Sequence, residues 1–180
     1  MEKILFTLVA TIWMCCMMSL NATAQNWRNY DCGLFNLQYP ATFKPSPIES
    51  AQHMILKVET QRGFFSFSTW DYDFRDEVSA WNDDIYAGYQ LMLGQDLDGL
   101  KAERIDKVQV STRSGAKKML RISSQGKTAF QGKTIYLKNV TYVIIHKGFL
   151  IVYGYQDANI HPFSYPYVAA ERILNRLKFK

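Results

Sequence analysis

The sequence predicts an α+β domain: a mostly antiparallel sheet of about six or seven strands with helices packed on both faces. Three observations lead to this prediction. Polar and apolar residues alternate over much of the chain after residue 34, which is the period of a half-buried strand. Short polar or glycine-containing breaks separate these runs, as they do between antiparallel neighbours. Residues 76–93 and 166–180 instead repeat apolar residues every three or four positions, as amphipathic helices do.

The first strands follow from this alternation. One strand is expected at residues 35–39, and Pro40 ends it because proline cannot donate a hydrogen bond to a ladder. Two further strands are expected at 53–60 and 63–70. The hairpin loop between them contains Gly63, which is available for a positive φ.

The helix over 76–93 has aspartates before its first turn, where carboxylates cap exposed N–H groups, and Gly94 can close it. Further strands are expected at 101–110, 116–124, 132–147 and 148–157. The last two are apolar on both faces for part of their length, which indicates a sheet covered on two sides. Pro166 suits the first turn of the closing helix.

The front of the chain is organised like a secretory signal peptide over residues 1–24. Charged residues precede an apolar run at 4–20, and Ala22 and Ala24 form an Ala-x-Ala cleavage site. We predict cleavage after Ala24, a single domain over 25–180, and a secreted or periplasmic location. The alternative is an N-terminal anchor, because the apolar run approaches the length of a bilayer span. After cleavage we expect no stable membrane span.

Charge and cysteine content limit the classes of function. The formal net charge is +5, but the lysines and arginines are spread out and form no basic block. This pattern favours solvated strand faces over nucleic-acid binding. Cleavage of the leader would leave Cys32 as the one cysteine, which indicates either a buried thiol or an intermolecular bond. Burial fits better, because Cys32 closely precedes a strand.

The segment GLFNLQYPATF at residues 33–43 resembles the first strand and bend of PsbP-like domains. Those domains are antiparallel sheets sandwiched between helices, a fold shared with a yeast nuclear-import factor that binds the GTPase Ran. The resemblance extends in outline over 25–180, with a hairpin, a central helix, a long hairpin and a closing helix through Phe179. The leader and pattern also resemble small secreted proteins of Bacteroides-type bacteria. The resemblance implies a binding or accessory module and brings no catalytic residue.

The most distinctive cluster of side chains is WDYDFRDE at residues 70–77, where carboxylates alternate with aromatic rings. Helix capping explains the later acids of this cluster but leaves its aromatic residues unexplained. We therefore predict a ligand-binding platform formed by Trp70, Asp71, Tyr72 and Asp73. Aromatic residues also crowd the C-terminal third of the chain. Alternate members belong to the core, and the others are candidates to line a groove.

No complete catalytic or metal-binding motif is present in the sequence. The Gly-Lys-Thr triplets at 126–128 and 132–134 lack the earlier glycine of a phosphate-binding loop. The acidic turn at 96–103 lacks the later ligands of a calcium loop. The histidines have no metal-binding spacing, and there is no Gly-x-Ser-x-Gly elbow. We predict no catalytic residue, no metal and no cofactor.

These observations predict a secreted, non-catalytic binding or accessory module of the bacterial cell envelope, with an envelope protein or glycan as its partner and no nucleic acid. An enzyme of unrecognised type and an electrostatic binder of anionic envelope surfaces are the alternatives. An enzyme would show a pocket where polar groups converge. A binding module would show an exposed apolar patch, and a surface binder a steep loss of affinity with salt.

Overall fold

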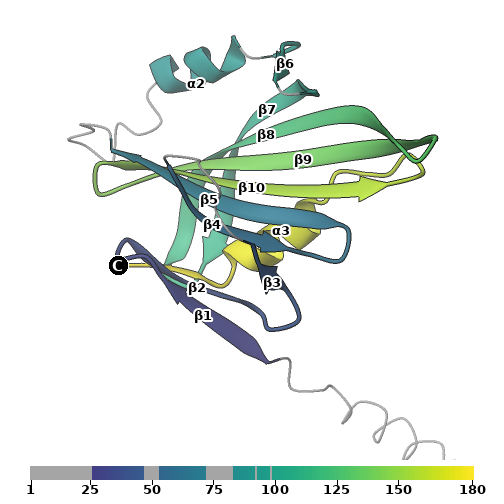
Figure 1. The fold of residues 1–180 in the computed structure, drawn as a ribbon. Coiled ribbons are helices and arrows are strands. Elements are labelled where there is room, and N and C mark those ends of the chain that lie inside the picture. The colour runs from purple at the N-terminus through teal and green to yellow at the C-terminus, as the bar shows by residue number, and fades with distance from the viewer. Residues whose placement is uncertain (1–25, 47–52, 72–82, 92, 98) are drawn as a thin grey trace, which may run out of the picture.

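The computed structural model describes residues 26–46, 53–71, 83–91, 93–97 and 99–180. Within them the chain forms a large and a small antiparallel sheet together with two short helices (Figure 1). None of the helices in this part of the chain is long and apolar enough to cross a bilayer. The leader lies outside the described residues, so both the leader and its cleavage stay predictions.

The large sheet has the order β3-β4-β5-β10-β9-β8-β7-β6, and all of its neighbouring strands are antiparallel. In chain order its strands are β3 (Lys44–Pro45), β4 (Met54–Glu59), β5 (Gly63–Asp71), β6 (Asp96–Leu97), β7 (Leu100–Thr112), β8 (Gly115–Phe130), β9 (Lys133–His146) and β10 (Phe149–Asn159). The small sheet has the order β1-β2-β11, with β1 (Trp27–Asp31), β2 (Phe35–Pro40) and β11 (Leu177–Phe179). The helices are α2 (Asp83–Gln90) and α3 (Tyr167–Leu174).

The predicted α+β arrangement with helices packed on both faces is wrong. Strands dominate the fold, and the large sheet has eight of them rather than six or seven. The small sheet and α3 together cover the first face of the large sheet, with which they share one hydrophobic cluster. On the second face, the described side chains of α2 contribute only Tyr86 and Tyr89. A second sheet thus replaces most of the expected helical layer.

The end of the chain accounts for part of this difference. The helix predicted over 166–180 stops at Leu174, and the last residues form β11, which pairs with β2. Leu177 and Phe179 are buried on either side of the exposed Lys178, which is the period of a strand. Pairing with β2 places both apolar side chains in the core, and a further helical turn would not align them with the same layer.

β1 is a strand that its own residues do not predict, because buried and exposed positions do not alternate along it. It pairs with β2 from Trp27 to Asp31. It is also tied to the large sheet, since the Tyr30 hydroxyl donates a hydrogen bond of 2.5 Å to the carbonyl of Ile55 in β4. Tertiary contacts rather than local pattern therefore hold this strand.

Aromatic side chains form the centre of the first-face core. The ring centroid of Phe67 lies 4.7 Å from that of Tyr153 and 5.0 Å from that of Phe35, so rings from both sheets meet there. The Tyr153 hydroxyl donates to the carbonyl of Ala170, which attaches α3 to the same core. Cys32 packs against this cluster as a half-buried free thiol.

A polar cluster fixes the outer side of α3 on β8. Arg121 forms ion pairs with Asp106 at 3.1 Å and with Glu171 at 3.5 Å, and its guanidinium lies 4.2 Å from the ring centroid of Tyr167. The hydroxyl of Tyr142 donates to Glu171 at 3.0 Å. These contacts hold α3 at a set height above the sheet, and α3 is one wall of the cavity described below.

The second face of the large sheet carries a smaller apolar cluster, formed by Ala102, Ile105, Leu120, Ile122, Val143 and Leu150. The sequence pattern of strands that are apolar on both faces is explained by this cluster and the first-face core together.

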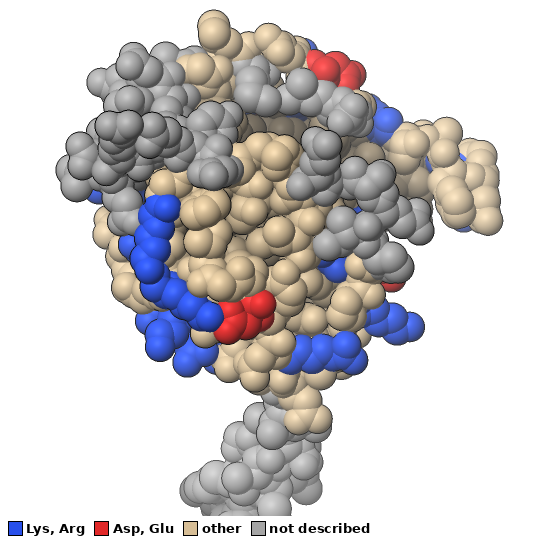
Figure 2. Space-filling model, turned by 60° about the vertical axis from the view of Figure 1, so that its left-hand side comes forward, with Lys and Arg blue, Asp and Glu red and all other residues tan. Residues whose placement is uncertain are grey.

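The view in Figure 2 shows a broad uncharged area with lysines and arginines gathered around its lower part and few acidic side chains. This surface agrees with the net charge of +5.

Candidate functional site

A groove lies beside α3 on the first face of the large sheet, with a cavity volume of about 550 Å³. Its lining comes from the start of β1, the bend after β2, the end of β10, the segment that leads into α3, and α3 itself. Five aromatic side chains contribute to its apolar wall: Trp27, Phe43, Tyr155, Phe163 and Tyr165. This volume falls within the range of about 300–1,000 Å³ that small-ligand sites occupy.

The polar centre of the groove is an ion pair. Arg62, in the loop between β4 and β5, holds the carboxylate of Asp157 in β10 at 3.0 Å. The Asp157 side chain is 3% exposed, whereas that of Arg62 is 59% exposed. A smaller cavity of about 110 Å³ continues from the groove around the same pair and shares Phe43 and Tyr155 with it. A ligand in the groove would therefore meet one exposed cation and one buried anion.

The environment of Asp157 acts against its charge. Burial raises the pKa of the Asp157 carboxyl above its usual value, although the charge and hydrogen bond of Arg62 oppose this shift. Burial, followed by the charge of Asp157, likewise raises the pKa of the neighbouring Tyr155 hydroxyl. A carboxylate that is held in a cavity against a desolvation cost is a feature of functional sites.

Asp157→Asn is expected to change how stability depends on pH. A carboxyl whose folded-state pKa is raised stabilises the fold fully below its unfolded pKa and loses that contribution as pH rises through the folded pKa. The variant lacks this loss, so its free energy of unfolding relative to the native chain should increase from acidic to neutral pH. Urea unfolding at several pH values measures the difference.

Asp31→Asn is the matched control with the opposite sign. The hydrogen bond from Lys180, at 2.5 Å, lowers the pKa of the exposed Asp31 carboxyl, with help from the N–H of Gly33. Asp31 therefore stabilises the fold above its unfolded pKa, and this contribution is lost as pH falls through the lowered value. The variant should lose stability toward neutral pH. The same trend in both variants would contradict the environment assigned to Asp157.

The aromatic wall is supported from behind. The Tyr165 hydroxyl donates to Glu103, the Lys138 ammonium lies 4.3 Å from the Tyr165 ring centroid, and the ring stacks on Tyr167. Burial and Glu103 raise the pKa of Tyr165, so this hydroxyl keeps its proton and stays a donor. Side chains with such fixed neighbours give the groove a pre-formed shape.

α3 supplies the outer wall and rim of the groove. Val168 lies on the rim with 85% of its surface exposed, and Arg172 lines the cavity one helical turn further on. An apolar side chain this exposed beside an aromatic cavity enlarges the surface that a ligand can cover. The helix thus adds an apolar edge and a second basic residue to the site.

The predicted Trp70 platform lies elsewhere. Trp70 is half-buried at the far end of β5, packs against the second-face cluster, and stacks on His53 with ring centroids 5.2 Å apart. Asp71 is the last residue of β5, opposite Phe149, and nothing of its side chain is described. Tyr72 and Asp73 lie outside the described residues, so the platform stays a prediction.

The groove was only partly visible in the sequence. Tyr155, Phe163 and Tyr165 belong to the aromatic-rich C-terminal third, where groove-lining residues were expected. Arg62 and Asp157 carried no such signal, because they are 95 positions apart and meet only when β5 pairs with β10. Within the described residues, no three histidines, cysteines or acids come close enough to hold a metal ion.

No protein-family model matches the chain, and no curated protein matches it. Among solved structures the chain is similar to LpqN, which is involved in cell envelope biogenesis of Mycobacterium tuberculosis, with 12% identity and a TM-score of 0.42 over 86% of this chain and 91% of LpqN. It is also similar to PA94, a protein of unknown function from Pseudomonas aeruginosa, with 12% identity and a TM-score of 0.32 over 73% and 83% of the two chains. These comparisons show no PsbP-like family, so that resemblance stays a prediction.

Proposed function

We propose that the protein is a secreted, non-catalytic binding module of the bacterial cell envelope and that its ligand occupies the groove beside α3. The observation that carries this proposal is the buried Asp157 paired with the exposed Arg62 at the centre of an aromatic cavity. A few fixed polar groups within an apolar lining are the usual composition of a binding site. Among the described residues that line the cavity, Asp157 is the one carboxylate.

The chemistry of the lining favours a glycan as the ligand. A sugar ring presents apolar C–H faces, which pack on aromatic rings, and hydroxyl edges, which hydrogen-bond to charged groups. The groove supplies rings from Trp27 and Phe163, together with the carboxylate of Asp157 and the guanidinium of Arg62. Charged partners strengthen such hydrogen bonds relative to neutral ones.

Calorimetric titration of residues 25–180 with oligosaccharides released from the cell envelope tests this proposal. Phe163→Ala should weaken binding about tenfold by removing one stacking surface. Trp70→Ala, an aromatic truncation at the predicted platform outside the groove, should leave the affinity unchanged. Far-ultraviolet circular dichroism of both variants would show whether the fold is retained.

Other outcomes would contradict the proposal in distinguishable ways. Loss of binding in Trp70→Ala alone would transfer the site to the platform at residues 70–73. Binding of envelope peptides and not of oligosaccharides would replace the glycan with a protein partner. Conversion of the oligosaccharide into new products during the titration would identify the protein as an enzyme.

A further inference from the structure

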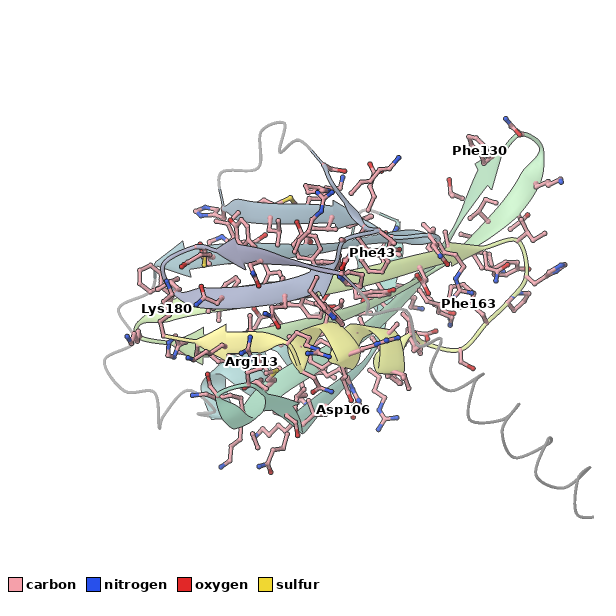
Figure 3. The ribbon with its side chains drawn as sticks, turned by 90° about the horizontal axis from the view of Figure 1, so that it is seen from below. Phe43, Asp106, Arg113, Phe130, Phe163 and Lys180 are labelled. Carbon is pink, nitrogen blue, oxygen red and sulfur yellow. The ribbon has the colours of Figure 1, made fainter. Side chains whose placement is uncertain are left out.

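The β8–β9 hairpin extends beyond the strands on either side of it. β8 pairs with β7 only as far as Gly126, and β9 pairs with β10 only as far as Tyr136. Residues 127–130 therefore pair only with residues 133–136, of which only Tyr136 also pairs with β10. Figure 1 shows this end of β8 and β9 beyond the rest of the sheet, and Figure 3 shows Phe130 at the far end of the projecting hairpin. We call residues 127–136 the arm.

The tip of the arm exposes an aromatic ring. Gln131 and Gly132 both have positive φ, of 49° and 74°, as the two central residues of a tight β-hairpin turn do. This turn sets Phe130 directly opposite Lys133, and paired residues lie on the same face of a ribbon. Phe130 is 63% exposed, and Lys133 is also exposed. An isolated two-stranded ribbon is marginally stable by itself, and most of the Phe130 side chain gains no burial from the rest of the sheet.

The charge on the arm itself has one sign. The sequence from Lys107 to Gln156 contains no aspartate or glutamate, and the arm carries Lys127 and Lys133. Glu103, an acid on the neighbouring β7, already accepts hydrogen bonds from Gln125 and Tyr165 at the base of the arm. The arm therefore presents positive charge beside its exposed ring, and the surface that complements it is anionic and apolar.

We propose that the arm binds an anionic lipid bilayer, with Phe130 entering the interface and the two lysines contacting acidic headgroups. Aromatic rings favour the membrane interface, and lysines extend their charge to the headgroups while their stems lie along apolar surface. A protein partner would need a larger matching surface, because specific protein interfaces bury at least about 1,200 Å². One exposed ring and two lysines on opposite faces of a hairpin offer less than this. The inference does not depend on the groove or on its ligand.

Cosedimentation with lipid vesicles tests the arm. The experiment uses residues 25–180, because the apolar run at 4–20 would itself enter lipid and because all described strands and helices lie between Trp27 and Phe179. Binding should occur on vesicles that contain phosphatidylglycerol and be absent on pure phosphatidylcholine. Lys127→Gln with Lys133→Gln should lower the apparent affinity about 30-fold, which corresponds to ~1 kcal/mol per lysine. Phe130→Ser should lower it about tenfold.

Two matched variants complete the experiment. Lys44→Gln with Lys178→Gln removes the same charge from exposed positions on β3 and β11, and Leu91→Ser removes an apolar side chain that is 75% exposed. Both should bind within about twofold of the native chain, because the substituted positions lie outside the arm and do not share its contacts with the bilayer. Equal losses in the control variants, or no binding to the acidic vesicles, would overturn the proposal. A change in oligomeric state with Phe130→Ser and unaltered vesicle binding would assign the arm to a second copy of the chain.

Discussion

Phe67→Ala is expected to lower the free energy of unfolding by about 3–5 kcal/mol, the range for truncation of a buried aromatic ring. Phe67 is fully buried in β5, between Tyr153 of the neighbouring strand and Phe35 of the small sheet. Loss of the ring leaves a cavity where the two sheets meet. The effect is therefore larger than the transfer free energy of the side chain alone, because the cavity removes contacts from both layers.

Urea unfolding followed by circular dichroism measures this loss. Phe130→Ala is the control, since it makes the same chemical change at a position that is 63% exposed in the arm. We expect it to change the free energy of unfolding by no more than about 0.5 kcal/mol. Equal effects of the two substitutions would contradict the packing of the small sheet on the large one.

Gly63→Ala is expected to destabilise the fold by about 3 kcal/mol, at the upper end of the usual cost of overpacking. A Cβ atom at this position would lie 1.9 Å from the carbonyl oxygen of Gln156 and 2.8 Å from its carbonyl carbon. Both are backbone atoms of β10, so they cannot rotate away as a flexible side chain can. The pairing of β5 with β10 must open next to Asp157, which also disturbs the polar centre of the groove.

Gly88→Ala provides the comparison for this substitution. Gly88 lies in α2, and a Cβ atom there would meet no other atom within 4 Å. Alanine favours a helix over glycine by about 1 kcal/mol, so the control should be neutral or stabilising. Thermal unfolding should show a lower melting temperature for Gly63→Ala and an unchanged or higher one for Gly88→Ala. Unchanged stability of Gly63→Ala would show that the two strands do not approach as closely as described.

Gly63 also shows how a correct local prediction can rest on the wrong reason. The hairpin between β4 and β5 was expected and is present, but the expected positive φ at Gly63 is absent. Glycine is required there because another strand passes too close for any side chain. That strand, β10, is far away in sequence, so the pattern around residue 63 holds no information about it.

The strands could be predicted wherever one face is buried and the other is not, because the alternation of residues records the burial. β2 and β4 follow this rule closely. The covering layer could not be predicted in this way. Ile173, Leu174 and Leu177 suit a helical stripe in the sequence. The chain nevertheless leaves the helix after Leu174, and Leu177 and Phe179 enter the small sheet.

The candidate site depended on tertiary structure even more strongly. Aromatic residues in the C-terminal third gave a composition from which a groove could be expected, and Tyr155, Phe163 and Tyr165 do line one. The ion pair of Arg62 and Asp157 could not be predicted from the sequence, because a single arginine in a loop and a single aspartate in a strand are each expected to be solvent-exposed. Burial of Asp157 becomes apparent only once β10 is central in the sheet.

By itself, the sequence determined where most strands run and that both faces of their sheet are apolar. The spacing of apolar residues along a segment indicates which of its side chains are buried, and this spacing can be read without the rest of the chain. It also contains the acid-free stretch from Lys107 to Gln156, which gives the arm its charge. Only the tertiary structure decided that a second sheet covers the first face, that Arg62 meets Asp157, and that Phe130 stands at an exposed tip. Each of these depends on which distant strands become neighbours, and the free energy of that pairing belongs to the whole packed chain rather than to any one segment.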